Sequence, residues 1–193
     1  MKMHGCCPPF EKPNIPGGFC PCCARALAEI LRRIITSPNN AIDIRTTSQT
    51  SSGKLLDVIP KAIRQNVLLE VDRNGTQQIV NLCEVVTIGD AKGGTAGGTA
   101  VRDVSFTGIN ATNCGCCEQA LTNLFQQLQG RTFDVLTTSP QTDNSFNVVS
   151  ILAITNGVVK INTGGQGNPV PRIVSLCHVV SLEDITPPLP PSV

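Results

Sequence analysis

The sequence predicts an α+β protein formed by tandem duplication of a small unit, in which an N-terminal helix is followed by about five antiparallel strands. Two observations support the duplication. Cysteines of the first half recur in the second half at one constant offset: Cys20, Cys22, Cys23 and Cys83 are matched by Cys114, Cys116, Cys117 and Cys177. The segment "IVNLCEVVTIGD" from Ile79 likewise recurs as "IVSLCHVVSLED" from Ile173. In both halves helical periodicity gives way to strand-like segments, which sets the element order.

The first 18 residues are predicted to form a flexible arm that carries cysteines. The arm is rich in Pro and Gly, contains no apolar run that resembles a signal-peptide core, and includes the adjacent pair Cys6 and Cys7. This pair has no counterpart in the second half, so the fold of the repeated unit does not require it. We therefore expect the arm to reach a neighbouring subunit.

Each unit is predicted to begin with an amphipathic helix. Apolar side chains recur along one face between Cys23 and Ile34 with a period of 3.6 residues, and charged side chains occupy the other face. The same pattern recurs from Cys117 onward. Pro38 is expected to end the first helix, and Gly130 is expected to end the second.

Short segments rich in branched side chains follow each helix and are predicted to be strands. In the first unit they read "AIDIRTT", "LLDVI", "NVLLEV" and "QIVNL". The dipeptide Asn74-Gly75 predicts a hairpin turn, and Asn156-Gly157 predicts the same turn in the second unit.

The composition between and after the units predicts a linker and a tail. The segment "AKGGTAGGTAVRD" is rich in small residues, as flexible linkers are. The final "TPPLPPSV" fits neither a helix interior nor a sheet interior because of its prolines. The predicted organisation is an arm at 1–18, a first unit at 19–91, a linker at 92–103, a second unit at 104–185 and a tail at 186–193.

One helix followed by about five short strands resembles the Sm-like small barrel, an SH3-like fold with an N-terminal helix. The closing segments "IVNLCEVVTI" and "IVSLCHVVSL" look like the last two strands of that fold with a tight turn between them. The resemblance implies two such barrels in tandem. It does not extend to RNA binding, because "LCE" from Leu82 and "LCH" from Leu176 stand where that family has Arg-Gly. A net charge of +1 and 3% aromatic residues also argue against a nucleic-acid partner.

The sequence gives little support for catalysis. The only histidines are His4, in the arm, and His178, which is replaced by Glu84 in the first unit. Cys177 and His178 are neighbours, and in a strand their side chains would point to opposite faces. "GGTAGG" lacks the lysine that follows in a phosphate-binding loop. We therefore expect no enzyme activity and no cofactor, and no membrane partner, since no stretch approaches the roughly 18 apolar residues of a membrane span.

The ten cysteines allow three roles: disulfide cross-linking, metal binding and thiol chemistry. Cys23 and Cys117 lie in register with the apolar faces of their helices, so we expect them to be buried. The cysteines just before each helix lie where backbone amides and the helix dipole favour the thiolate. The candidates for cross-links are Cys6, Cys7, Cys20, Cys22, Cys83, Cys114, Cys116 and Cys177.

A structural zinc site is the alternative role. Its ligands would be Cys20, Cys22, Cys23 and Cys83, but the second Cys-x-x-Cys pair typical of zinc sites is missing within the unit. A thiol–disulfide enzyme would also use Cys-x-x-Cys at the start of a helix, but there the motif follows a strand in a βαβ unit. Here it follows a Pro- and Gly-rich arm. We therefore favour cross-linking and expect no bound metal.

The combination of "CPCC", a helix and the closing "LCEVVTI" or "LCHVVSL" resembles cysteine-rich structural proteins that spore-forming Firmicutes make for the spore coat, exosporium or surface appendages. The arm "GCCPPF" is similar to the N-terminal connectors of endospore appendage subunits, whose jelly-roll fold these helices do not match. The resemblance implies a self-assembling subunit of a spore surface layer or extracellular fibre. It further implies synthesis without a signal peptide, inter-subunit disulfides, and itself and other spore-surface proteins as partners. The alternative is an intracellular Sm-like module that binds a metal or acts as an adaptor.

Overall fold

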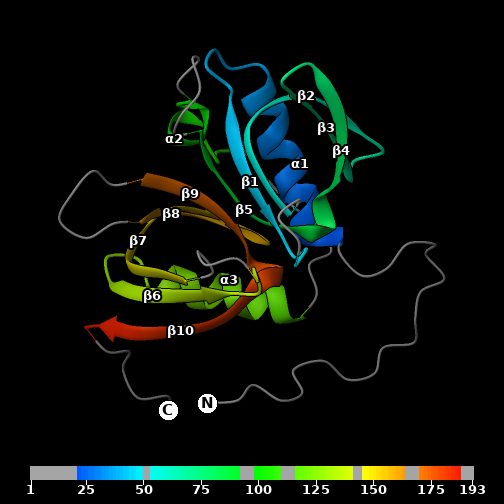
Figure 1. The fold of residues 1–193 in the computed structure, drawn as a ribbon. Coiled ribbons are helices and arrows are strands. Elements are labelled where there is room, and N and C mark those ends of the chain that lie inside the picture. Colours follow the sequence, from blue (N-terminus) through cyan, green and yellow to red (C-terminus); the bar gives the residue numbers. More distant parts are fainter. Residues whose placement is uncertain are drawn as a thin grey trace, which may run out of the picture.

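The computed structural model describes residues 21–49, 53–91, 98–109, 116–140, 145–163 and 170–187. Along the chain, α1 precedes the strands β1 to β5, and α2 and α3 precede the strands β6 to β10 (Figure 1). The helices are α1 (Pro21–Ile35), α2 (Ala100–Asp103) and α3 (Cys116–Gln127). The strands of the first half are β1 (Ile42–Thr46), β2 (Lys54–Arg64), β3 (Leu68–Arg73), β4 (Thr76–Asn81) and β5 (Val85–Asp90). Those of the second half are β6 (Thr132–Thr137), β7 (Ser145–Thr155), β8 (Val158–Thr163), β9 (Val170–Ser175) and β10 (Val179–Thr186).

The predicted tandem pair of Sm-like, SH3-like barrels is wrong. The described strands form one ten-stranded antiparallel sheet in the order β10-β6-β7-β8-β9-β5-β1-β2-β3-β4, accompanied by three α-helices. The two halves merge where β5 pairs with β9. Without this pairing, the backbone N–H and C=O groups on the open edges of β5 and β9 would lack strand partners.

Helix α1 forms where the apolar periodicity predicts it. The side chains of its inner face are fully buried: Cys23, Leu27, Ile30, Leu31 and Ile34. On the outer face Arg33 donates hydrogen bonds to the carbonyls of Ser105 and Thr107 at 2.8 and 2.9 Å. The helix ends before Pro38, and the Asn40 amide caps it by donating to the Ile35 carbonyl at 3.1 Å.

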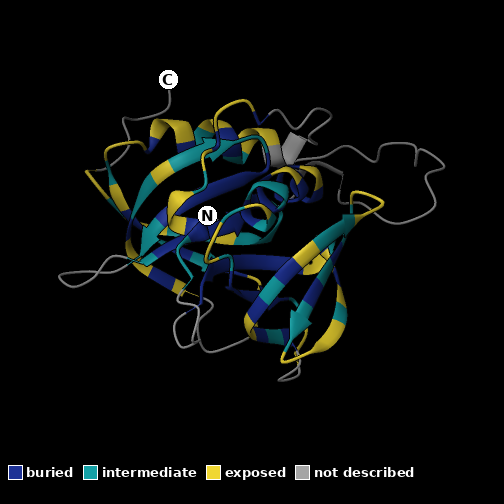
Figure 2. Cartoon of the chain, turned by 90° about the horizontal axis from the view of Figure 1, so that it is seen from above, coloured by how far each residue is buried: buried dark blue, intermediate teal, exposed yellow. Residues whose placement is uncertain are grey.

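Two apolar clusters fill the molecule. Helix α1 packs on β2, and Figure 1 shows β2, β3 and β4 curving around it, while α3 packs on β7. The cluster around α1 also includes Val158 and Ile173 from the second half, so the core continues across the β5–β9 junction. The cluster around α3 is centred on Phe125 and Phe133, whose rings meet edge to face at 5.7 Å. Buried residues gather toward the middle of the molecule and exposed ones toward its rim (Figure 2).

Part of the predicted linker is ordered. Residues 100–103 form α2, which packs on β5 and β9. The Asp90 carboxylate accepts hydrogen bonds from the backbone N–H groups of Val101 and Arg102 at 2.7 and 3.2 Å. Lys160 donates to the carbonyl of Val104 at 3.1 Å and to that of Arg102. These contacts hold the short helix against the junction.

Candidate functional site

The cysteines of the two halves meet at the junction between them. Cys23, in the first turn of α1, forms a disulfide with Cys177, with the two Cα atoms 6.3 Å apart. The Cys177 N–H also points at the Cys23 sulfur, at 3.2 Å. Cys23 is fully buried. The bond therefore ties a helix of the first half to the closing segment of the second half.

Each closing segment contains a one-turn 3₁₀ helix with a cysteine at its centre. These are η2 (Leu82–Glu84), between β4 and β5, and η3 (Leu176–His178), between β9 and β10. Both turns are anchored alike: the Leu82 N–H donates to the Val67 carbonyl and the Leu176 N–H to the Gly157 carbonyl, each at 2.9 Å. Cys83 in η2 and Cys177 in η3 therefore occupy equivalent positions.

His178 connects the two turns. Its Nε2 atom lies 2.9 Å from the carbonyl oxygen of Cys83, and its Nδ1 atom lies 3.0 Å from the Thr138 hydroxyl. Because a carbonyl only accepts, the Nε2–H donates across the junction. The sequence predicts a strand at Cys177 and His178 with their side chains on opposite faces, whereas the structure places both residues in η3. The run of branched residues around Cys177 fits a continuous strand as well as two strands with a 3₁₀ turn between them, so the sequence alone does not distinguish these conformations.

The structure describes only part of the predicted cysteine set. Cys83 is half-buried, and Cys23 and Cys177 are bonded to each other. In the alternative zinc set Cys23 would have to be a thiolate, and in the disulfide it is not. The part of the chain that is described holds no group of three or more His, Cys, Asp or Glu placed to bind a metal. Cys6, Cys7, Cys20 and Cys114 lie outside the described residues, as do the side chains of Cys22, Cys116 and Cys117.

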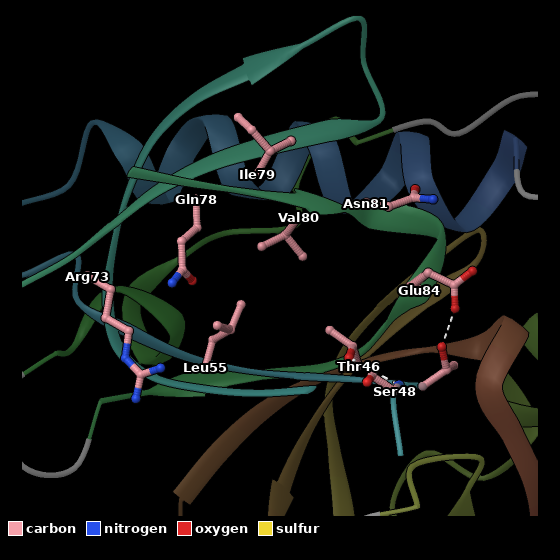
Figure 3. Close-up of a pocket in the computed structure, with 10 residues that line it drawn as sticks. Thr46, Ser48, Leu55, Arg73, Gln78, Ile79, Val80, Asn81 and Glu84 are labelled. Carbon is pink, nitrogen blue, oxygen red and sulfur yellow. Dashed lines mark hydrogen bonds between the residues drawn. The ribbon is translucent and has the colours of Figure 1, made fainter. Parts of the chain in front are cut away.

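An open cleft of about 640 Å³ runs along β4, at one end of the sheet. Figure 3 shows Gln78 and Val80 pointing from β4 toward its interior. The Thr47 hydroxyl donates to the Glu84 carboxylate at the far end of the cleft. The lining residues are Thr46, Thr47, Ser48, Leu55, Arg73, Gln78, Ile79, Val80, Asn81 and Glu84. They include hydroxyls, amides, one guanidinium and one carboxylate.

Two ionisable side chains are buried at the junction. Burial raises the pKa of the Asp90 carboxyl above its ordinary value, although the N–H groups of Val101 and Arg102 oppose the rise. Burial lowers the pKa of the Lys160 ammonium, and the carboxylates of Asp90 and Asp103 oppose that fall. Both side chains bond to backbone groups in α2 or directly after it, so they hold the helix in place.

No protein-family model, no curated protein and no solved structure matches this chain. None of the described helices combines the length and the apolar character needed to cross a bilayer. The fold and the site define a cysteine-rich α+β protein, in which one antiparallel sheet spans both halves and a buried disulfide closes the junction.

Proposed function

We propose that the chain is a structural subunit that assembles with copies of itself and is stabilised by disulfides between subunits. The observation that carries this proposal is the Cys23–Cys177 bond. It joins Cys23, from the cysteine cluster at the start of α1, to Cys177 of η3. Both of these sequence elements occur twice in the chain. We expect the equivalent pair, Cys117 and Cys83, to join chains.

The sheet supports the same proposal. Among the described strands, β4 and β10 stand at the two ends of the sheet, each with one neighbour. An edge strand offers a row of backbone donors and acceptors to another chain. The arm at 1–18, with Cys6 and Cys7, adds a cross-linking segment that the fold of the repeated unit does not require.

The disulfide also supports a location outside the reducing cytosol, because buried structural disulfides persist in oxidising surroundings. Together with the resemblance to cysteine-rich spore proteins, this favours a spore surface layer or an extracellular fibre. Immunogold labelling of a spore-forming host that expresses the chain tests the location. Label on the spore surface or on fibres is expected, and label confined to the cytosol contradicts it.

The test of assembly is negative-stain microscopy of purified protein, oxidised and then treated with reductant and denaturant. We expect ordered assemblies that release monomers only when reductant is combined with heat or denaturant. Thiol titration of the same samples is the control, since assembly has to consume thiols. Monomers in oxidising buffer, with every thiol other than those of Cys23 and Cys177 titratable, would refute the proposal.

A further inference from the structure

We propose that subunits join edge to edge, with β10 of one copy pairing antiparallel with β4 of the next copy in the register that β5 and β9 use inside the chain. The inference rests on the proposed self-assembly and names the contact responsible for it.

The two ends of the sheet are repeat counterparts of the two strands that meet at its centre. "IVNLCEVVTIGD" runs from β4 through η2 into β5, and "IVSLCHVVSLED" runs from β9 through η3 into β10. Strand β4 therefore corresponds to β9, and β5 corresponds to β10. Inside the chain β5 pairs with β9, which leaves β10 and β4 at opposite ends. The end strands β10 and β4 are thus equivalent to β5 and β9, which already pair with each other inside the chain.

The exposed fractions of equivalent residues show which side chains the proposed contact between copies would cover. On β4, Ile79 is 51% exposed, whereas its counterpart Ile173 on β9 is fully buried. On β10, Val180 is 57% exposed, whereas its counterpart Val86 on β5 is fully buried. Apolar side chains on an open edge favour pairing with another strand. The exposed residues are the counterparts of those that the internal junction buries.

The internal register predicts the pairs of the new contact. Within the chain Thr87 faces Val174, Ile88 faces Ile173, and Gly89 faces Arg172. The corresponding pairs between copies are Ser181 with Val80, Leu182 with Ile79, and Glu183 with Gln78. The second pair is apolar, and in the third the glutamine amide donates to the carboxylate. All three β4 residues line the cleft, so the incoming β10 would cover its rim (Figure 3).

The disulfide extends the same correspondence. At the internal junction the half that supplies β5 supplies Cys23, and the half that supplies β9 supplies Cys177. In the contact between copies, the copy that supplies β10 supplies Cys117, and the copy that supplies β4 supplies Cys83. The predicted cross-link is therefore Cys117 to Cys83 of the next copy.

Forming this cross-link requires an oxidant, and a low-molecular-weight disulfide is the class that fits. One protein thiolate attacks the small disulfide, and one small thiol leaves. The second protein thiolate then attacks the mixed disulfide, and the second small thiol leaves. One S–S bond forms between the chains and one breaks in the oxidant. The two protein thiols give up two electrons and two protons, which leave with the two small thiols.

One substitution makes the contact between copies weaker than the internal one. His178 donates across the internal junction to the Cys83 carbonyl, and its counterpart is Glu84. A carboxylate cannot donate to the carbonyl of Cys177 in the equivalent place. We therefore expect the strand pairing to form reversibly and the cross-link to make it permanent. Because the contact joins two different edges, its repetition gives a closed ring or an open filament.

The test uses the full chain with Ile79→Lys on β4, Val180→Lys on β10, and Leu152→Lys as the matched control. Leu152 is 51% exposed but lies on β7, between two neighbouring strands. Under oxidising conditions wild type and Leu152→Lys should assemble, while each edge variant alone stays monomeric in sedimentation velocity. An equimolar mixture of the two edge variants should give dimers and nothing larger, because the intact β10 of Ile79→Lys pairs with the intact β4 of Val180→Lys and only the two substituted edges are left open. This mixture also shows that both variants are folded.

The outcomes separate the inference from the proposed function. If wild type does not assemble, both are overturned. If wild type assembles and the edge variants assemble equally well, the self-assembly stands and the edge contact is wrong. Dimers of either edge variant by itself would show like edges pairing and overturn the head-to-tail contact. Peptide mapping of the wild-type assembly should find Cys83 linked to Cys117, and a Cys83→Ser variant should assemble but come apart in denaturant without reductant.

Discussion

Removing the Cys23–Cys177 disulfide should destabilise the folded chain by an amount that the structure predicts. The bond closes a loop with a sequence separation of 154 residues. For a loop of that length the chain-entropy relation gives about 5 kcal/mol near room temperature, and removal of native disulfides typically costs roughly 2–5 kcal/mol. The double variant Cys23→Ala/Cys177→Ala should therefore lose free energy of unfolding in that range. Alanine avoids leaving a buried hydroxyl without a partner at position 23.

The assay is urea unfolding at protein concentrations below the onset of assembly, without reductant and with the midpoint and slope both fitted. Cys83→Ala is the matched control, because Cys83 lies at the equivalent position in η2 and also packs against the core. It loses a comparable side chain without losing the bond, and should cost about 1 kcal/mol or less. A double variant within about 0.5 kcal/mol of wild type would refute the claim that this bond holds the two halves together.

Two further predictions concern the junction. Gly89→Val should destabilise the fold by about 1–3 kcal/mol in urea unfolding, because a Cβ at position 89 would lie 2.2 Å from an Arg172 nitrogen. Unchanged stability would contradict this prediction and mean that the side chain of Arg172 moves aside. Because the pKa of Asp90 is raised, the folded chain binds more protons than the unfolded chain just above the ordinary value of 3.8, so the contribution of Asp90 to stability falls as pH rises there. Asp90→Asn removes this slope, so the stability of wild type relative to the variant should fall with pH in urea titrations, and a relative stability that rises with pH would contradict the assignment.

Local patterns carried much of the element assignment. The apolar period from Cys23 to Ile34 is a property of neighbouring residues, and α1 spans it. The hairpin predicted at Asn74-Gly75 joins β3 to β4, where Asn74 adopts a positive φ of 53°. Such signals depend on a few consecutive residues, so a single sequence contains them.

The joining of the two halves could not be predicted in the same way. Strands β5 and β9 pair Thr87 with Val174, residues far apart in the sequence, and no local pattern specifies such a pairing. A partial signal is present in the closing strands. "VVTIGD" in β5 carries Gly89 where "VVSLED" in β10 carries Glu183. A run with fewer charges fits a strand covered on both sides, and every residue of β5 is buried.

The site was harder to predict than the helices. The sequence pattern predicts that Cys23 lies on a buried helix face and that Cys177 is a candidate for cross-links between subunits. Nothing in the pattern indicates that these two cysteines pair with each other. Their bond follows from the β5–β9 junction, which brings η3 to the first turn of α1. A disulfide between distant residues can be predicted only after the strand order is known.

The most direct test of the account is isotopic. Unlabelled and nitrogen-15-labelled chains, mixed in equal amounts while reduced and unfolded, are refolded, oxidised and digested without reduction. If disulfides join subunits, about half of the cross-linked peptides should combine one labelled and one unlabelled partner, while the Cys23–Cys177 peptide, which lies within one chain, should carry the same label on both sides. Matching labels in every disulfide-linked peptide would contradict the account.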